Sequence, residues 1–269
     1  MSWRDAGNIK AIVRSAVALV VTVALFVPQA LVRTVSRGPA AFVLPQLWHR
    51  ALCRTLGIEV VQTGAIDTCP GTVYVGNHVS HFDIFVMGSC SRAAFIAKED
   101  MARWPGMQLL GSMQQTLFVS RRARDAARVA QRVAEARRRG HRLVLFAEGT
   151  TSSGVDVAPF KSSLFSVLID SGKHRSDDGA QRAPPRLQPF TIRLLETDST
   201  ALCQGGDRDV YAFHGGAPAG AHVWRFLRSR GARVEVVFHP PITVRPDMTR
   251  KSLAKTAHAI VAASLDSLG

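Results

Sequence analysis

The segment VYVGNHVSHFDI, residues Val73 to Ile84, begins as a β-branched run and continues as an apolar segment with helical character. We expect a strand as far as Gly76, a turn at Asn77 and His78, and a helix that starts near Asp83. Five positions separate the histidine from the aspartate, which on one continuous helix would place them about 140° apart. The two side chains can therefore meet only if a turn intervenes, with His78 at the carboxyl end of the strand.

An aspartate that accepts a hydrogen bond from one imidazole nitrogen fixes the tautomer and leaves the other nitrogen as a base. The sequence therefore indicates His78 as a general base and Asp83 as its partner, with a substrate hydroxyl as the attacking group. The structural alternative is a histidine before a helix with a solvated aspartate. For an arbitrary HxxxxD spacing, that alternative is the commoner explanation.

Downstream of Gly57, short β-branched runs alternate with helical stretches, which predicts an α/β fold with a mixed, mostly parallel sheet flanked by helices. A helix is expected over Asp125 to Arg139, with Gly140 as its C-cap. Ser171 to Pro185 is polar and rich in turn formers, so we expect a loop there. The predicted strands are 58–62, 72–76, 94–97, 117–119, 142–146, 187–193, 210–213 and 234–238.

The chain has 269 residues and a formal net charge of +14, which favours a polyanionic partner. Nucleic acid is not expected, because the chain lacks the spacing of zinc fingers and the aromatic pattern of RNA-recognition motifs. A membrane surface or a phosphorylated substrate remains. Four cysteines without a CxxC pair indicate neither a zinc site nor a disulfide framework, and they fit a reduced compartment.

The N-terminal part of the chain contains an uncharged, mostly apolar stretch from Ser15 to Val32, close to the lower length limit for a transmembrane helix. A cleaved signal peptide is the alternative. Pro39 to Leu56 carries Trp48 and His49 and is interpreted as an interfacial amphipathic helix. We therefore expect membrane-anchoring helices over 1–56 and a catalytic domain over 57–269, with spanning and monotopic anchoring both open.

Asn77 to Asp83 matches the NHxSxxD block of the glycerolipid acyltransferase family, which the chain resembles over several blocks in the same order. The resemblance implies His78 as catalytic base and Asp83 as its orienting partner, with Asn77 and Ser80 as motif residues. Phe95 to Glu99, which includes Lys98, and Trp104-Pro105-Gly106 resemble the stretch that follows this block.

Leu117 to Arg121 resembles the second block, in which Phe118 is a motif residue and Arg121 is implicated in binding the acceptor's phosphate. Gln115 stands where the family commonly has glycine. Phe146 to Thr150 resembles the third block, FPEGTR, in which Glu148, Gly149 and Thr150 shape the acceptor site. Here Ala147 replaces the proline and Thr151 the arginine.

Two further stretches complete the resemblance. Pro159 to Ser163 is similar to a segment found in the family, including among enzymes that acylate lyso-ornithine lipid, and its Lys161 could supply a replacement cation for the acceptor. Gln188 to Arg193 resembles the fourth block, in which Pro189 lies near the acyl-binding region.

The resemblance implies an acyltransferase that moves a fatty acyl group from acyl-CoA or acyl-carrier protein to lysophosphatidic acid, forming phosphatidic acid in phospholipid biosynthesis. The missing arginine at Thr151 opens an alternative, acylation of lyso-ornithine lipid or another lysolipid. The expected partners are membrane lipids, the acyl donor and the lysolipid acceptor, with no metal or other cofactor. The expected location is the cell (inner) membrane, with the catalytic domain facing the cytoplasm.

Parts of the sequence also fit three other functions. A hydrolase would use Ser80, His78 and Asp83, but the chain has no GxSxG elbow. A metalloenzyme would use His78, His81 and Asp83, but a further strong ligand is hard to name. An inactive, membrane-associated lipid-binding relative is the non-enzymatic alternative, and the presence of all the motif residues argues against it.

Overall fold

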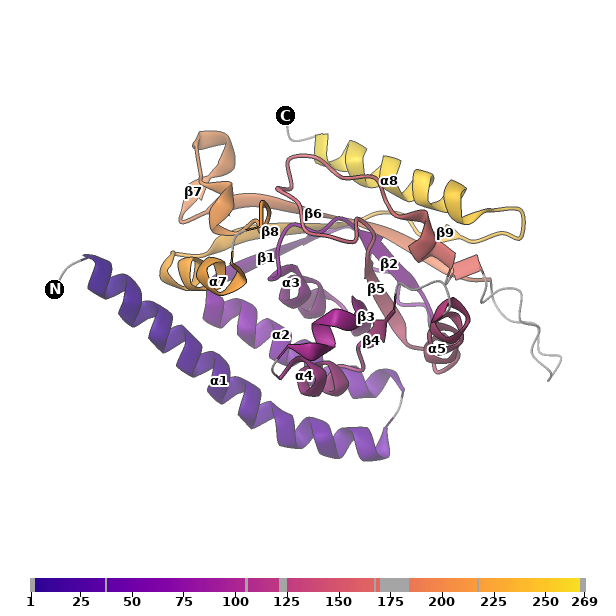
Figure 1. Cartoon of the computed structure of the whole chain (residues 1–269), viewed down its shortest axis with the longest axis horizontal. Helices are drawn as coiled ribbons and strands as arrows, with labels where there is room; N and C mark the ends of the chain where they lie inside the picture. The colour runs from indigo at the N-terminus through magenta and orange to yellow at the C-terminus, as the bar shows by residue number, and fades with distance from the viewer. Residues whose placement is uncertain are drawn as a thin grey trace.

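The computed structural model describes residues 3–36, 38–104, 106–120, 125–166, 168–169, 184–216 and 218–266. Its centre is one mixed sheet in which the hydrogen-bonded path runs β1-β8-β6-β2-β5-β3-β4, with β7 and β9 each paired to β6 (Figure 1). Strand β6 is antiparallel to β7, β8 and β9, and the other pairs are parallel. The strands are β1 (Ile58–Thr63), β2 (Val73–Gly76), β3 (Ala93–Lys98), β4 (Leu117–Val119), β5 (Arg142–Phe146), β6 (Arg186–Thr197), β7 (Thr200–Ala201), β8 (Ala232–Phe238) and β9 (Ile242–Thr243).

Helices cover both faces of this sheet, as the sequence predicted (Figure 1). On one face α2 (Val43–Leu56), α3 (Asp83–Cys90) and α7 (Ala219–Arg228) bury apolar side chains in one core cluster. On the other face α5 (Ala126–Arg138) and α8 (Arg250–Asp266) contribute to a second cluster. The remaining helical elements are α1 (Trp3–Val35), α4 (Met107–Met113) and the short 3-10 helices η1 (Pro39–Phe42), η2 (Glu99–Arg103), η4 (Ser162–Phe165), η5 (Leu202–Gln204) and η6 (Arg208–Val210).

Strand β2 lies in the middle of the sheet, between β5 and β6 and parallel to both. All four of its residues are buried; Tyr74 packs in the first core cluster, and Val73 and Val75 pack in the second. This alternation is what a strand covered on both faces requires. Because parallel strands end at the same edge of a sheet, the segments that follow β2 and β5 emerge side by side, where α/β proteins commonly bind ligands.

Seven of the eight predicted strands are present, and the prediction of a strand at 210–213 was wrong. There the chain forms η6 and then irregular backbone, although Val210 and Tyr211 are buried. The run is apolar like a strand, but its main-chain N–H groups donate to the carbonyls of Arg208 and Val79 and not to a neighbouring strand. Helix α5 occupies the predicted range, and Gly140 follows it with φ 77°. Most of the predicted loop at 171–185 lies outside the described residues.

Helix α1 spans 33 residues and is longer than the apolar stretch that predicted it. One of its faces packs on the domain, where Ala11 and Gln29 are buried. Helix α2 follows it, and the Trp48 and His49 side chains that indicated an interfacial helix are buried within the protein. The Trp48 indole donates to Thr22 of α1 at 3.0 Å. The boundary between an anchor over 1–56 and a catalytic domain over 57–269 stays a prediction.

Candidate active site

His78 lies two residues after the end of β2, and Asp83, which follows a turn closed by its N–H bond to the Ser80 carbonyl, is the first residue of α3. The carboxylate of Asp83 folds back over this turn, and its Oδ2 lies 2.8 Å from Nδ1 of His78. The same oxygen accepts the main-chain N–H groups of Val79 at 2.6 Å and Ser80 at 2.9 Å. These contacts are those of an aspartate that bonds backbone groups at a turn. They confirm that the turn brings the histidine and the aspartate together.

The two side chains differ in their access to solvent. Asp83 is fully buried, whereas the side chain of His78 retains 16% of its accessible surface. Because Nδ1 faces a carboxylate oxygen, we assign the proton of the neutral ring to Nδ1. Nε2 is therefore the nitrogen that can accept a proton.

Aromatic side chains fix the plane of the imidazole. Phe146, the last residue of β5, stacks on His78 with ring centroids 4.0 Å apart and an interplanar angle of 12°. Nearby, the His81 ring packs against Phe213 at 4.1 Å. Burial, with a smaller contribution from the neighbouring His78 and His222, lowers the pKa of His81 to about 4. His81 is therefore neutral at physiological pH and adds no positive charge beside the base.

Residues of the third block hold the main chain of His78. Oε1 of Glu148 accepts the N–H of His78 at 2.7 Å, and Oε2 accepts the N–H of Ala158 at 3.0 Å. The N–H of Ser152 donates to the His78 carbonyl at 2.8 Å. Glu148 is only 1% exposed, and burial raises its pKa. Its carboxylate therefore holds residues 78–83, called the catalytic turn below, from the interior of the protein.

Asn77 joins the end of β2 to β6. Its side-chain amide donates to the Ile192 carbonyl at 2.9 Å, and its carbonyl oxygen accepts the Ile192 N–H at 2.7 Å. Pro189 lies on β6 opposite Val75. Ser80 is fully buried beside Asp83. The first and fourth blocks are thus parts of one scaffold.

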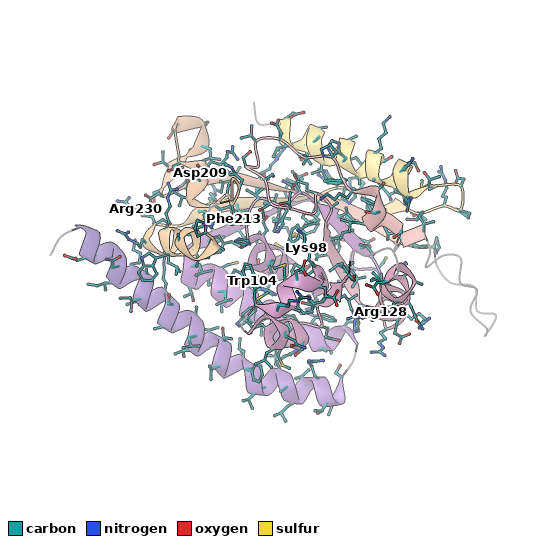
Figure 2. The ribbon with its side chains drawn as sticks, in the orientation of Figure 1. Lys98, Trp104, Arg128, Asp209, Phe213 and Arg230 are labelled. Carbon is teal, nitrogen blue, oxygen red and sulfur yellow. The ribbon has the colours of Figure 1, made fainter. Side chains whose placement is uncertain are left out.

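The other predicted site residues are less closely tied to His78. Thr150 and Lys161 are exposed, although the Lys161 N–H bonds to the Ala147 carbonyl next to Glu148. Gly149 has φ 72°, which favours glycine. Lys98, labelled in Figure 2, is the last residue of β3, and Phe118 lies on β4. Arg121 lies outside the described residues.

Gln115 occupies a backbone conformation that explains the family's preference for glycine at this position. Its φ is 57°, in the left-handed region, just after α4 and before β4. A side chain there costs conformational energy that glycine avoids. The departure from the family pattern is therefore a local strain in the approach to the second block.

One residue at the site was missed by the sequence analysis. The hydroxyl of Tyr211 donates to Oδ1 of Asp83 at 2.8 Å, and the tyrosine is fully buried. It lies 128 positions from its partner. No motif or periodicity pointed to it, and the only available signal was a hydroxyl within an apolar run.

Comparison with known proteins agrees with this geometry. The model of the Acyltransferase family matches residues 57–186. A lyso-ornithine lipid O-acyltransferase of Brucella abortus is 34% identical, and the match covers 83% of this chain and 82% of that protein. One from Rhodobacter capsulatus is 31% identical, over 70% of this chain and 63% of that protein.

Two further similarities involve enzymes named for another acceptor. A 1-acyl-sn-glycerol-3-phosphate acyltransferase of Neisseria gonorrhoeae is 38% identical over 44% of this chain and 46% of that protein. The crystal structure of the 1-acyl-sn-glycerophosphate acyltransferase from Thermotoga maritima has a TM-score of 0.59 at 18% identity and covers 95% of this chain and 97% of its own, which shows a shared fold. Together with the family match and the relative from Brucella, these similarities show that the chain belongs to the glycerolipid acyltransferase family and is an O-acyltransferase.

Proposed function

We propose that this protein transfers a fatty acyl group from a thioester donor to the free hydroxyl of a lysolipid, with His78 as general base. The observation that carries the proposal is the 2.8 Å contact between His78 Nδ1 and the fully buried Asp83. Nε2 takes the proton of the acceptor hydroxyl as its oxygen attacks the thioester carbonyl. When the tetrahedral intermediate collapses, the carbon–sulfur bond breaks, and the proton on His78 neutralises the departing thiolate. Acyl groups and protons then balance without a covalent enzyme intermediate.

The electrostatics of the site suit this reaction. During proton transfer the imidazole gains positive charge, and the adjacent carboxylate stabilises it in surroundings with little water to screen the interaction. A positioned general base contributes about 10²–10⁴-fold to the rate. Because burial keeps His81 neutral, it does not oppose this charge.

For the acceptor we propose lyso-ornithine lipid. This proposal rests on the relatives of that name, which match over most of the chain, whereas the 1-acyl-sn-glycerol-3-phosphate acyltransferase of Neisseria matches over 44% of it. Thr151 provides a physical reason, because an ornithine headgroup has no phosphate monoester for an arginine to bind.

Lysophosphatidic acid is the second candidate acceptor. The higher identity of 38% to the Neisseria enzyme favours it. In that case Arg121 and Lys161 would have to supply the cations that bind the phosphate, with Gly149 and Thr150 shaping the adjoining loop. The donor in either case is proposed to be acyl-CoA or acyl-carrier protein, and no resident cofactor is proposed.

The N-terminal helix favours association with a membrane. Residues 5–35 are long and apolar enough to cross a bilayer, with a mean hydropathy of 2.2 over the most apolar window. The outward face of α1 exposes a continuous set of large apolar side chains: Ile9, Ile12, Val13, Val17, Leu19, Val20, Val23, Val27, Leu31 and Val35. An exposed apolar face of this length indicates contact with lipid.

Polar contacts at both ends of α1 support a monotopic arrangement. Near its start, Arg14 donates to the carbonyls of Leu227 and Ser229 at the end of α7, at 3.1 and 2.9 Å. Near its other end, Gln29 donates to the carbonyls of Ala41 and Met113, at 2.9 and 2.8 Å. We therefore propose that α1 lies along the catalytic domain within one leaflet of the inner membrane, on its cytoplasmic side.

The acceptor is tested by acyl transfer in isolated membranes, with acyl-CoA and acyl-carrier protein as donors and lyso-ornithine lipid and lysophosphatidic acid offered side by side. We expect a preference for lyso-ornithine lipid, and a shift towards lysophosphatidic acid in Thr151→Arg. A preference of the unmodified protein for lysophosphatidic acid would establish the second candidate. Absence of donor-dependent transfer to any lysolipid would contradict the proposed function.

A further inference from the structure

Residues 207–213 lie outside all four sequence blocks, but they hydrogen bond to the catalytic turn and to the loop that follows the third block. Arg208 donates to the Gly154 carbonyl at 3.1 Å, in the loop that follows the third block. The N–H of Phe213 donates to the Val79 carbonyl at 2.9 Å, in the catalytic turn. The ring of Phe213, labelled in Figure 2, packs against His222 of α7 with centroids 5.2 Å apart. Tyr211 lies between these two attachments.

The hydrogen-bonding capacity of Asp83 is used in an asymmetric way. Oδ2 accepts three N–H groups, from the imidazole of His78 and from the main chain of Val79 and Ser80. Oδ1 accepts the hydroxyl of Tyr211 at 2.8 Å, in a fully buried contact. A buried carboxylate oxygen that lacked this donor would bear a large desolvation cost. Tyr211 therefore donates to Oδ1, the carboxylate oxygen of Asp83 that does not bond to the catalytic turn.

The ring of Tyr211 has little freedom to move its hydroxyl. Phe226 of α7 packs against it edge-on, with ring centroids 5.8 Å apart, and Phe82 of the catalytic turn lies at the same distance. Burial and the neighbouring carboxylate raise the pKa of Tyr211 well above 10. The hydroxyl therefore keeps its proton and always acts as a donor to Asp83.

We propose that Tyr211 is a positioning residue for acyl transfer, which fixes the rotamer of Asp83 and thereby the orientation of the His78 imidazole. This inference rests on the proposed function, because it assumes that His78 is the base. Tyr211 does not touch the reacting atoms, and it acts by keeping Oδ2 aimed at Nδ1. Its loss should therefore lower kcat and leave the KM for donor and acceptor nearly unchanged.

The chain offers a matched control, because it contains only two tyrosines. Tyr74 on β2 is also fully buried, and its hydroxyl donates at 2.7 Å to the Asp67 carbonyl and not to Asp83. Tyr211→Phe and Tyr74→Phe each remove one buried, hydrogen-bonded hydroxyl. Only Tyr211→Phe removes a donor to Asp83. A general effect on folding from the loss of a buried hydroxyl would appear in both variants.

The experiment measures kcat and KM for acyl transfer together with thermal unfolding of the purified full-length protein. For Tyr211→Phe we expect kcat to fall by about 10- to 100-fold, as for loss of a hydrogen bond to a buried charge. For Tyr74→Phe we expect kcat within about twofold of the unmodified protein, by the same reasoning. A Tyr211→Phe protein that is folded and retains kcat would overturn the proposal.

A second comparison separates positioning from folding even if Tyr211→Phe accumulates poorly. Asp83→Asn removes the buried charge that the lost hydroxyl would leave unpaired, so the double variant Asp83→Asn, Tyr211→Phe is expected to fold. In the asparagine background, Tyr211→Phe should change the residual kcat by less than about threefold, because the two residues act as a unit. An additive loss would mean that Tyr211 acts independently of Asp83 and would refute the inference.

The same measurements distinguish this inference from the proposed function. His78→Ala is included in the series. If that variant kept its activity, the proposed base would be wrong, whatever Tyr211→Phe did. If His78→Ala were inactive while Tyr211→Phe retained kcat, only the role of Tyr211 would be refuted.

Discussion

Replacing Asp83 by asparagine removes one negative charge from the site and can keep all of its hydrogen bonds. Three N–H donors converge on Oδ2, so the asparagine oxygen must occupy that position. The new amide group then faces Tyr211, whose hydroxyl can rotate to accept a hydrogen bond in place of donating one. The substitution therefore isolates the contribution of charge from that of shape.

The expected loss follows from Coulomb's law. A full positive charge on His78 about 4 Å from the carboxylate charge is stabilised by ~4 kcal/mol at an effective dielectric constant of about 20. At ~1.4 kcal/mol for each factor of ten, this corresponds to about 10³-fold in rate. Because the imidazole carries only part of that charge in the transition state, we expect kcat to fall by about 10²–10³-fold, with KM nearly unchanged.

The assay compares acyl transfer by Asp83→Asn, the unmodified protein and Asp247→Asn. Asp247 pairs with Arg245 at 3.2 Å, and both side chains are about two-thirds exposed, so it controls for loss of a carboxylate from an ion pair. We expect Asp247→Asn to be as active as the unmodified protein. A folded Asp83→Asn protein with kcat within about fivefold of normal would refute the electrostatic reasoning.

Three further predictions concern burial, packing and backbone strain. Burial lowers the pKa of His49 to about 3, below the ordinary 6.5, so below pH 6.5 the unfolded chain binds a proton that the folded protein excludes. The free energy of unfolding should therefore fall as the pH drops below 6.5, by up to ~1.4 kcal/mol per pH unit. Urea unfolding at several pH values should show a shallower fall for His49→Gln. Gly88→Ala should destabilise the protein by about 1–3 kcal/mol, because the new Cβ would lie 2.2 Å from the His49 ring. Its control is Gly220→Ala on α7, where the new Cβ meets nothing within 4 Å and the protein should become slightly more stable. Equal melting temperatures of the two variants would contradict this prediction. Gln115→Gly should raise the stability measured in thermal melts by up to about 1 kcal/mol, because it removes a side chain from a left-handed backbone position. A loss of stability would show that no strain is stored at this position.

Local pattern was enough to predict the central features of the fold. Burial on both faces of the sheet explains why β2 consists of apolar and aromatic residues and glycine. The change from a strand-like to a helix-like sequence pattern after β2 predicted the turn that brings His78 and Asp83 together. The parallel strands β2 and β5 then bring Glu148 to the same edge. The strand, the turn and the helix start follow from short-range rules, whereas Glu148 was indicated by the family resemblance and contacts His78 from 70 positions away.

The remaining features depend on contacts between distant parts of the chain. Tyr211 lies 128 positions from Asp83, and an apolar run that is buried without pairing in the sheet resembles a strand in its sequence. Trp48 and His49 are typical of an interfacial helix, but His49 packs on Gly88 of α3 and Trp48 packs on Phe85 of α3 and Thr22 of α1, so both side chains are buried. Whether a polar or aromatic side chain on an amphipathic helix faces lipid or protein is decided by its partner helices.

The central claim, that His78 is the base for acyl transfer to a lysolipid, is tested most directly by His78→Ala in a donor-dependent transfer assay. His214→Ala serves as control, because His214 lies at the surface in an exposed pair with Asp209 at 2.9 Å. We predict that His78→Ala, folded and membrane-bound, loses at least about a hundredfold in transfer while His214→Ala remains active. Near-normal transfer by His78→Ala would contradict the account.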